Sequence, residues 1–554
     1  MAPFKTECMD VTSVGRKRIL LVMPDWRSAT SKWTPNDHPY LNKKALMPPL
    51  SLATIAALTP EDFEIDIWDE SVHGFINDDT RFPVSYDIVG IGGYYSHIFR
   101  VLTLAGIFKR RGDFLVAGGA GVTASPKEYR EYFDVLILGE SEYIWPQFLH
   151  DFLDGNYKKT YKEINPVNMA HSPKPKWGNI KALMAGNYTV GAVQTTRGCP
   201  FRCDFCNEWR IFGRKVRTKS TQQVIEEIEE LSNAGLKQIV FGVDNFYGNH
   251  KYAREILTAI IEFNKTQSEP LHFITQISVT ISSDDEFLKM MADAGFNGLF
   301  IGIESPKAAS LIESKKLQNL KGDLLENCKK ILSYGLPVEA SMIVGFDEDD
   351  ESIFDAQFDF IQKSCIPYPR IRLLQAKPCT DLFDKLILER RVLDTSKLHL
   401  AENYFDTYLI SNIIPASMTR ISLFENYLKL LDRVFDMDNF TERMMGFIDL
   451  INYCPEREKK EDVRIIGGKL PAELNNFIRK IDPKEQDCVE KILNHAASKV
   501  PHQLNNIVGL IVRQQFEAQQ VEETKKTILS QIEFERNLDL SQCILEVSEG
   551  IDDL

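Results

Sequence analysis

Cysteine is scarce in this chain, with only 10 in 554 residues. Long apolar runs are also missing, because no stretch approaches the roughly 18 residues that a membrane-spanning helix needs. The opening residues, MAPFKTECMDVTSVGRKR, lack the apolar core of a secretion signal. These absences exclude a membrane span and a disulfide framework. We therefore expect a cytoplasmic protein.

Basic residues are outnumbered, with 65 Lys and Arg against 79 Asp and Glu and a net charge of -14. A general nucleic-acid binder needs a basic surface that neutralises phosphates, so we expect no nucleic-acid partner. One local exception is a short basic cluster, which is either a solvated face or a contact for a cofactor carboxylate or phosphate. Its members are Arg210, Arg214, Lys215, Arg217 and Lys219.

Three of the few cysteines, Cys199, Cys203 and Cys206, lie close together in TRGCPFRCDFC. Three thiolates on one loop can bind three irons of a cubic four-iron four-sulfur cluster and leave the fourth iron open to a small molecule. The alternative is a zinc site completed by a histidine. Such sites usually pair two close ligand knuckles, and the next histidine is His250. The spacing favours the iron–sulfur cluster.

Short apolar runs alternate with helical segments over residues 17–155, which predicts a doubly wound, Rossmann-like parallel sheet. The runs are 18–23, 63–68, 87–91, 113–117 and 134–138. Ligands of such sheets bind at the carboxyl ends of the strands, where glycines gather here. No G-x-G-x-x-G follows the first run, so a dinucleotide is not the expected ligand. The glycines either admit a ligand or only make tight turns.

A second series of six βα repeats over residues 188–390 predicts a partial (β/α)6 barrel of the TIM type. The runs are 190–194, 238–242, 272–276, 298–302, 337–344 and 370–374. The cysteine loop follows the first of them and so opens on the carboxyl face, where barrels place their sites. We expect residues 1–16 to be a tail, residues 156–187 a linker and residues 391–554 a helical domain. Its helices are expected at 422–435, 440–453, 484–498 and 512–534.

Cys199, Cys203, Phe205 and Cys206, placed after the first strand of such a barrel, resemble the radical S-adenosylmethionine superfamily. The resemblance implies that the open iron chelates S-adenosylmethionine. It also implies that one electron from the cluster cleaves this molecule to a 5'-deoxyadenosyl radical. An external electron donor such as flavodoxin or ferredoxin is then implied as a partner.

The resemblance extends to the residues that contact S-adenosylmethionine in this superfamily. Asp244 and Asn245 occupy the place of the motif that meets the methionine amino group, and Glu304 lies where polar groups reach the ribose. Gly345 lies in a segment similar to the adenine motif. The full expected set is Phe205, Asp244, Asn245, Gln276, Glu304 and Gly345.

The first sheet is similar to the cobalamin (B12) domain of one branch of this superfamily. Residues 47–52, MPPLSL, and the turns around residues 118 and 139 carry the likeness. The D-x-H-x-x-G motif, whose histidine binds cobalt in many B12 proteins, is absent, so the lower face of cobalt is expected to be open or capped otherwise. The residues implied to bind cobalamin are Pro49, Gly92, Gly93, Gly118, Gly119, Gly139 and Glu140.

The resemblance implies a cobalamin-dependent enzyme that methylates an unactivated carbon of a small molecule, with no catalytic residue assigned. One alternative is a cyclisation or ring rearrangement without methyl transfer. Another is a non-catalytic corrinoid-binding or zinc-binding protein. The helical C-terminal part is similar to an extension found in a subgroup that includes hopanoid-modifying enzymes. Cys379, where family members often have glycine, is either a thiol at the substrate or an inert buried cysteine.

Overall fold

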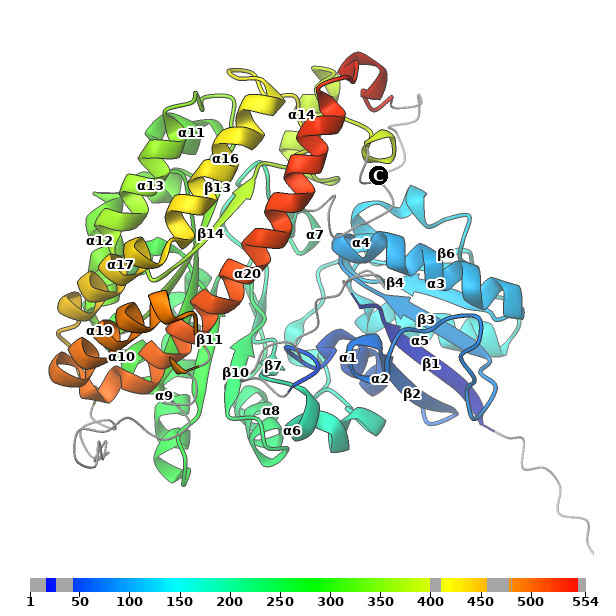
Figure 1. Ribbon diagram of the computed structural model, residues 1–554. Coiled ribbons are helices and arrows are strands. Elements are labelled where there is room, and N and C mark those ends of the chain that lie inside the picture. The colour runs from blue at the N-terminus through cyan, green and yellow to red at the C-terminus, as the bar shows by residue number, and fades with distance from the viewer. Residues whose placement is uncertain (1–15, 26–42, 399–409, 456–477, 480, 547–554) are drawn as a thin grey trace, which may run out of the picture.

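The computed structural model describes residues 16–25, 43–398, 410–455, 478–479 and 481–546. The expected tail, residues 1–16, lies outside the described residues except for Arg16. An N-terminal sheet stands beside a larger barrel, and the C-terminal helices cover the outside of the barrel (Figure 1). The mixed α/β class predicted from the sequence is confirmed.

The N-terminal sheet has six parallel strands in the order β2-β1-β3-β4-β5-β6. Helices cover both faces, so the first strand is buried over residues 19–22 and reads as a continuous apolar run. The strands are β1 Lys17–Met23, β2 Phe63–Asp69, β3 Ile88–Gly92, β4 Leu115–Gly118, β5 Val135–Leu138 and β6 Thr160–Lys162. The helices are α1 Leu50–Leu58, α2 Glu70–His73, α3 Ile98–Arg111, α4 Ala120–Ala124 and α5 Ser141–Leu153.

The strand order reverses between β1 and β3, and such a switch point is where doubly wound sheets bind ligands. The sixth strand lies inside the segment 156–187, which the sequence indicates is an extended connection. It has three residues, of which only Tyr161 is buried, so no alternating pattern could predict it. The rest of the segment carries η5 Gly178–Leu183 and α6 Met184–Asn187.

The barrel sheet also has six parallel strands, in the order β14-β13-β12-β11-β10-β7. Four of its helices begin at polar N-caps where Ser220, Asn249, Asp284 or Asp323 accepts a backbone N–H of the first turn. The strands are β7 Gly191–Val193, β10 Gln238–Phe241, β11 His272–Gln276, β12 Phe296–Glu304, β13 Val338–Val344 and β14 Tyr368–Leu373. The helices are α8 Thr221–Asn233, α9 His250–Thr266, α10 Asp285–Ala294, α11 Ala308–Glu313, α12 Leu324–Ser333, α13 Ile353–Ser364 and α14 Asp381–Leu388.

In the described residues after 410, the long helices are α16 Arg420–Phe435, α17 Met437–Leu450, α19 Pro483–Lys499 and α20 Leu504–Glu535. The last helix reaches back to the barrel, because the Arg513 guanidinium lies 3.6 Å from the Tyr368 ring centroid and 2.5 Å from Glu339. A fully buried pair, Arg420 and Glu535 at 2.7 Å, joins α16 to the end of α20. Figure 1 shows α20 running along β14. Within the described ranges no helix combines the length and apolarity that crossing a bilayer requires.

Candidate active site

The cysteine loop lies between two short antiparallel strands, β8 Thr196–Arg197 and β9 Arg217–Thr218, and contains the helical turn α7 Glu208–Ile211. Gly198 starts the loop with a φ of 100°, and a Cβ there would lie 2.5 Å from the Lys215 carbonyl oxygen. Its N–H donates to Asp244 Oδ2 at 2.6 Å. Glycine is thus required at position 198, and the second barrel strand positions the loop.

The three thiols of the loop are half-buried to buried. Burial raises the pKa of Cys199 to about 11 and that of Cys206 to about 12, so the free loop carries neutral thiols, and metal binding would release their protons. Among the described residues, no three His, Cys, Asp or Glu side chains converge on a single-ion site. In a cubic cluster each thiolate binds a different iron, so the thiols need not converge. Three thiols on one loop fit that mode of binding.

Lys316, whose side chain is 14% exposed, is a residue of this site that sequence reasoning missed. Its Nζ lies 2.7 Å from Glu304 Oε1 and 5.8 Å from the Phe205 ring centroid. Its positive charge also opposes the effect of burial on the pKa of Cys203. Gly302 provides the space, because a Cβ there would lie 2.6 Å from Nζ and 2.2 Å from Glu304 Oε1. No local pattern marks this lysine, since α11 separates it from Glu304.

Glu304 ends β12 in a backbone conformation that side chains rarely adopt, with a φ of 65°. Three contacts hold it there. Gln357 Nε2 donates to the Glu304 carbonyl at 3.0 Å, Ser341 Oγ donates to its carboxylate at 3.3 Å, and Lys316 pairs with the same carboxylate. The strain is therefore balanced by contacts that fix the carboxylate at the carboxyl end of the barrel.

The loop after β13 is pinned beside the cysteine loop. Gly345, with a φ of 105°, and Phe346 both donate their N–H groups to Asp349 Oδ2, at 2.9 and 3.1 Å. Ser310 Oγ donates to the other oxygen at 2.6 Å. Phe346 then meets Phe205 edge to face, with centroids 6.1 Å apart. Two segments predicted to contact one cofactor are thus neighbours.

The other predicted contacts lie at the ends of β10 and β11. Asn245 is buried, and its Oδ1 accepts the Ser278 N–H at 3.2 Å, which ties the two strand ends together. Burial raises the pKa of Asp244, although the Gly198 N–H opposes this effect. Gln276 ends β11 and is exposed. Together with Glu304, these side chains line the carboxyl ends of three neighbouring strands.

The glycines at the edge of the N-terminal sheet have two kinds of surroundings. A Cβ at Gly119, where φ is 100°, would lie 2.9 Å from the Gly93 carbonyl oxygen. Gly139, with a φ of 88°, has the Glu163 carbonyl oxygen at the same distance. Tight packing between loops therefore requires glycine at both positions. Gly92 and Gly118, which were also predicted to bind cobalamin, end β3 and β4. A Cβ at either position would meet its nearest neighbours at ordinary van der Waals distances.

Tyr94 projects from the loop after β3 and is 64% exposed. Even so, burial raises the pKa of its hydroxyl, and the carboxylate of Glu208 on α7 adds to the rise. Tyr94 packs against Gly121 of α4, and α4 contacts α7, so Tyr94 lies where the edge of the sheet meets the cysteine loop. His97 below it is buried, and its Nδ1 accepts the Tyr94 N–H at 3.0 Å. Burial lowers the pKa of His97 to about 4, so the ring is neutral at pH 7.

Glu140, expected at the cobalamin site, contacts the barrel. Its carboxylate lies 2.7 Å from Arg197 Nη1 and 2.7 Å from Arg217 Nη1, while Glu142 pairs with Arg197 Nη2 at 2.7 Å. All four side chains are at most 10% exposed. This cluster joins the last turn of the sheet to both strands of the hairpin. Pro49, another expected contact, is the N-cap of α1, and its carbonyl accepts the Ala53 N–H.

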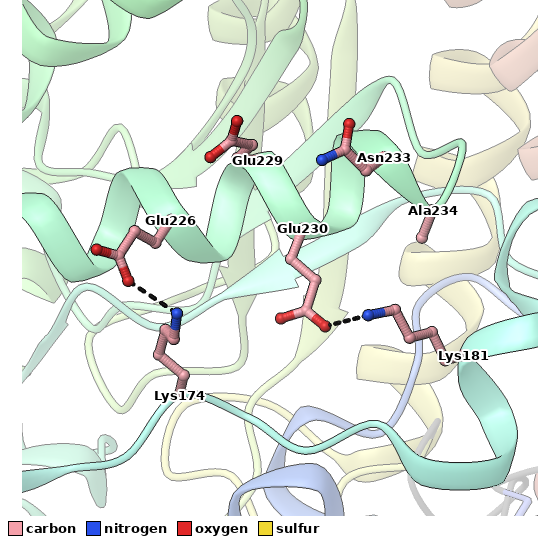
Figure 2. Close-up of a pocket in the computed structure, with 7 residues that line it drawn as sticks. All are labelled: Lys174, Lys181, Glu226, Glu229, Glu230, Asn233 and Ala234. Carbon is pink, nitrogen blue, oxygen red and sulfur yellow. Dashed lines mark hydrogen bonds and ion pairs between the residues drawn. The ribbon is translucent and has the colours of Figure 1, made fainter.

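A surface groove lies away from this site, between the linker and α8 (Figure 2). Lys174 reaches Glu226 at 2.8 Å and Lys181 reaches Glu230 at 2.6 Å, so both lysines of the groove are paired across it. The pairs hold the linker against the barrel. Nothing in the groove matches the chemistry of the cysteine loop.

Residues 193–359 match the model of the Radical SAM superfamily. The chain is 30% identical over 386 residues to hopanoid C-2 methylase of Rhodopseudomonas palustris, covering 68% of this chain and 71% of that one. It is 26% identical over 441 residues to bacteriochlorophyllide d C-12(1)-methyltransferase of Chlorobaculum tepidum, covering 78% and 90%. An uncharacterised methyltransferase of a Synechocystis strain is 29% identical over 405 residues and covers 73% of each chain.

Two solved structures share the fold. The radical S-adenosylmethionine methyltransferase TsrM from Kitasatospora setae aligns with a TM-score of 0.55 at 16% identity, over 68% of this chain and 76% of that one. The cobalamin-dependent S-adenosylmethionine radical enzyme OxsB aligns with a TM-score of 0.56 at 14% identity, over 96% and 82%. The fold and the sequence matches thus define a radical S-adenosylmethionine enzyme. Within that class, the chain belongs to the methyltransferase-like family that includes hopanoid C-2 methylase.

Proposed function

We propose that this chain methylates an unactivated carbon of a small molecule through a 5'-deoxyadenosyl radical and methylcobalamin. The observation that carries the proposal is the arrangement of its two candidate cofactor sites. The glycine-rich edge of the sheet faces the cysteine loop, and Glu140 ties the two together through Arg197 and Arg217. A methyl donor and a radical generator must both reach one substrate carbon, and this arrangement brings their sites together.

In the barrel, Cys199, Cys203 and Cys206 would hold the cluster. S-adenosylmethionine would lie between the cysteine loop and the strand ends that carry Asp244 and Glu304. The Glu304 carboxylate is already positioned and could accept a hydrogen bond from a ribose hydroxyl. Phe205, Asn245, Gln276 and Gly345 would complete that site.

At the sheet, cobalamin would bind beside Tyr94, where the edge of the sheet meets the cysteine loop. The neutral ring of His97 accepts the Tyr94 N–H through Nδ1, so a ring nitrogen is not free on that side to bind cobalt. This fits a sequence without the D-x-H-x-x-G motif. The backbone around Gly92, Gly93, Gly118 and Gly119 would approach the corrin, and Pro49 and Gly139 would flank it. We assign Glu140 to holding the sheet and the barrel together at this edge.

When bound, the cluster supplies the electron that cleaves S-adenosylmethionine, and the corrinoid supplies the methyl group. The chain would place the substrate and exclude water. Lys316 would keep a positive charge beside the thiolates and fix the Glu304 carboxylate. The names of the two characterised relatives, hopanoid C-2 methylase and bacteriochlorophyllide d C-12(1)-methyltransferase, support methylation at carbon. An oxygen-sensitive cluster also favours the reducing cytoplasm, where an external electron donor is available.

The test needs no substrate. We would reconstitute the chain anaerobically with iron, sulfide and hydroxocobalamin, reduce it, and add S-adenosylmethionine with a labelled methyl group. We expect 5'-deoxyadenosine from cleavage and labelled methylcobalamin from methylation of cobalt. The variant Cys206→Ala should lose the first product and keep cobalamin, while the control Cys454→Ala should retain both.

Three outcomes would contradict parts of the proposal. A protein that takes up only zinc would not be a radical enzyme. Deoxyadenosine without labelled methylcobalamin would favour a cyclisation or rearrangement. Deoxyadenosine formation by Cys206→Ala would refute the assignment of the cysteines to the cluster.

A further inference from the structure

The basic cluster after the cysteine loop divides into two groups in the folded chain. Arg217 turns inward to Glu140, and Lys219 is buried against Glu227 at 2.7 Å. Arg210, Arg214 and Lys215 are exposed instead. Arg202 and Lys315 join them at the surface, with side chains 57% and 50% exposed. We call this surface the loop patch, and its members are Arg202, Arg210, Arg214, Lys215 and Lys315.

The loop patch keeps a positive charge after its ion pairs are counted. Asp381 lies 3.4 Å from Arg202, 2.9 Å from Arg210 and 3.1 Å from Lys315. Asp384 lies 2.7 Å from Arg210. Two carboxylates therefore pair with three of the five cations, and Arg214 and Lys215 form no ion pair in the described structure, so exposed cations outnumber their partners here on a chain whose net charge is -14. A local sign opposite to that of the whole chain can steer an acidic partner to this surface.

The patch is the outer surface of the cysteine loop itself. Arg202 and Arg210 stand 4.9 and 5.7 Å from the Trp209 ring centroid, and the indole Nε1–H donates to the Cys203 carbonyl at 3.0 Å. Arg214 donates to the carbonyl of Pro200, between the first two cysteines, at 3.1 Å. The Trp209 indole, which lies between the two arginines, is therefore one hydrogen bond from the backbone of Cys203, a proposed cluster ligand. An electron that reaches this surface has a short path to the cluster site.

We propose that the loop patch docks an acidic one-electron carrier protein of the flavodoxin class. The carrier's flavin hydroquinone would give one electron to the oxidised cluster and become a semiquinone, while the cluster is reduced by one electron and no covalent bond changes. The proposed function needs this electron but says nothing about its route. The Trp209 contact with the cysteine loop indicates which surface the partner would meet. The exposed cations of that surface indicate that the partner is acidic.

The test compares two charge reversals of equal size. Arg214→Glu/Lys215→Glu changes the patch at residues whose side chains form no ion pair in the described structure. Lys237→Glu/Lys265→Glu is the control, because those exposed lysines lie beyond the amino ends of β10 and β11. Stopped-flow bleaching of the oxidised cluster would give the rate of reduction by an acidic flavodoxin hydroquinone, at low and high salt, and by dithionite.

We expect the patch variant to be reduced by flavodoxin at least about tenfold more slowly at low salt, with a smaller difference at high salt. Dithionite should reduce both variants and the wild type at equal rates. Equal flavodoxin rates for the patch variant and the control would overturn the proposal. If no cluster assembles, flavodoxin affinity for the unreconstituted chain decides, and unchanged affinity in the patch variant would equally overturn it. Neither readout needs methyl transfer, so a failure of the proposed function would be seen separately.

Discussion

The Lys316 ammonium lies 2.7 Å from the Glu304 carboxylate, in a space that exists because residue 302 is glycine. The Glu304 side chain is buried and that of Lys316 is 14% exposed, so each compensates the charge of the other in a region of low dielectric. The pair stands beside the cysteine loop, with the ammonium over the Phe205 ring. Its integrity therefore affects both the stability of the barrel and the charge that the cluster site experiences.

Lys316→Met should destabilise the cluster-free chain by about 3 to 5 kcal/mol, because it leaves the Glu304 carboxylate buried without its cation. The neighbouring Lys315→Met is a matched control. Lys315 is half exposed and pairs with Asp381 at the surface, so its loss should cost less than about 1 kcal/mol. Urea denaturation followed by circular dichroism measures both. Equal losses would show that the Lys316 pair contributes no more than a surface pair.

Gly302→Ala tests whether the Lys316–Glu304 pair needs the space that a glycine leaves at position 302. The new Cβ would meet the Lys316 ammonium at 2.6 Å and the Glu304 carboxylate at 2.2 Å, so the pair must move. We expect a loss of about 1 to 3 kcal/mol. Gly509→Ala on α20 has nothing within 4 Å of the new methyl group and should stabilise the chain by about 0.4 to 1 kcal/mol. Thermal unfolding compares them, and a shift in the same direction for both would contradict the packing argument.

Arg197→Met should loosen the contact between the sheet and the barrel. The substitution leaves Glu142 without its cation and Glu140 with only Arg217, at a cost of about 3 to 5 kcal/mol. Lys181→Met removes the exposed pair with Glu230 in Figure 2 and should cost less than about 1 kcal/mol. Hydrogen exchange followed by mass spectrometry should show faster exchange in the hairpin β8–β9 for Arg197→Met alone. Exchange unchanged from the wild type would mean that other contacts hold the two parts together.

His97 should make the cluster-free chain less stable as the pH falls from 6.5 to about 4. Burial lowers the pKa of His97 to about 4, below its usual 6.5, so the unfolded chain binds a proton in this range and the folded chain does not. The contribution is fully present above pH 6.5 and reaches a loss of about 3 kcal/mol near pH 4.

His97→Asn removes the titrating group while its amide oxygen can still accept the Tyr94 N–H. Stability relative to the wild type should therefore improve between pH 7.5 and pH 5 in urea titrations. His150→Asn, at a side chain that is 77% exposed, is the control and should stay within about 0.5 kcal/mol of the wild type at both pH values. A difference between His97→Asn and the wild type that does not change with pH would mean that folding does not shift the pKa of His97.

Sequence reasoning succeeded where a structural element leaves a repeating pattern. Strands buried on both faces read as apolar runs, so all six barrel strands and five of the six strands of the first sheet were predicted. The strands it missed, β6, β8 and β9, have two or three residues each and are too short to show a period. Helix α20 begins at Leu504, before the predicted residue 512. Its first turns bury Leu504, Ile507 and Ile511 at helical spacing, so the sequence did carry a signal for the earlier start.

The candidate site was predictable only in part, because its key contacts join distant segments. The cysteine spacing is local and could be read directly. Lys316 is paired with Glu304 across a helix, and Glu140 with Arg217 across two domains, so neither contact leaves a spacing in the sequence. The glycines of these turns can be read in the sequence, but the packing that requires them cannot, since a Cβ at Gly119 would contact a loop 26 residues away.

Arg197 and Arg217 lie on the two strands that enter and leave the cysteine loop, and one carboxylate of the other sheet grips both. A displacement of the N-terminal sheet would therefore move both ends of the cysteine loop together, so the sheet and the loop would move as one rigid body. The separation between a methyl donor at the sheet edge and a radical source on the loop would then be set within the protein before any substrate arrives. For a reaction that tolerates little error in that distance, the ion pairs of the Glu140 side chain would keep the distance constant.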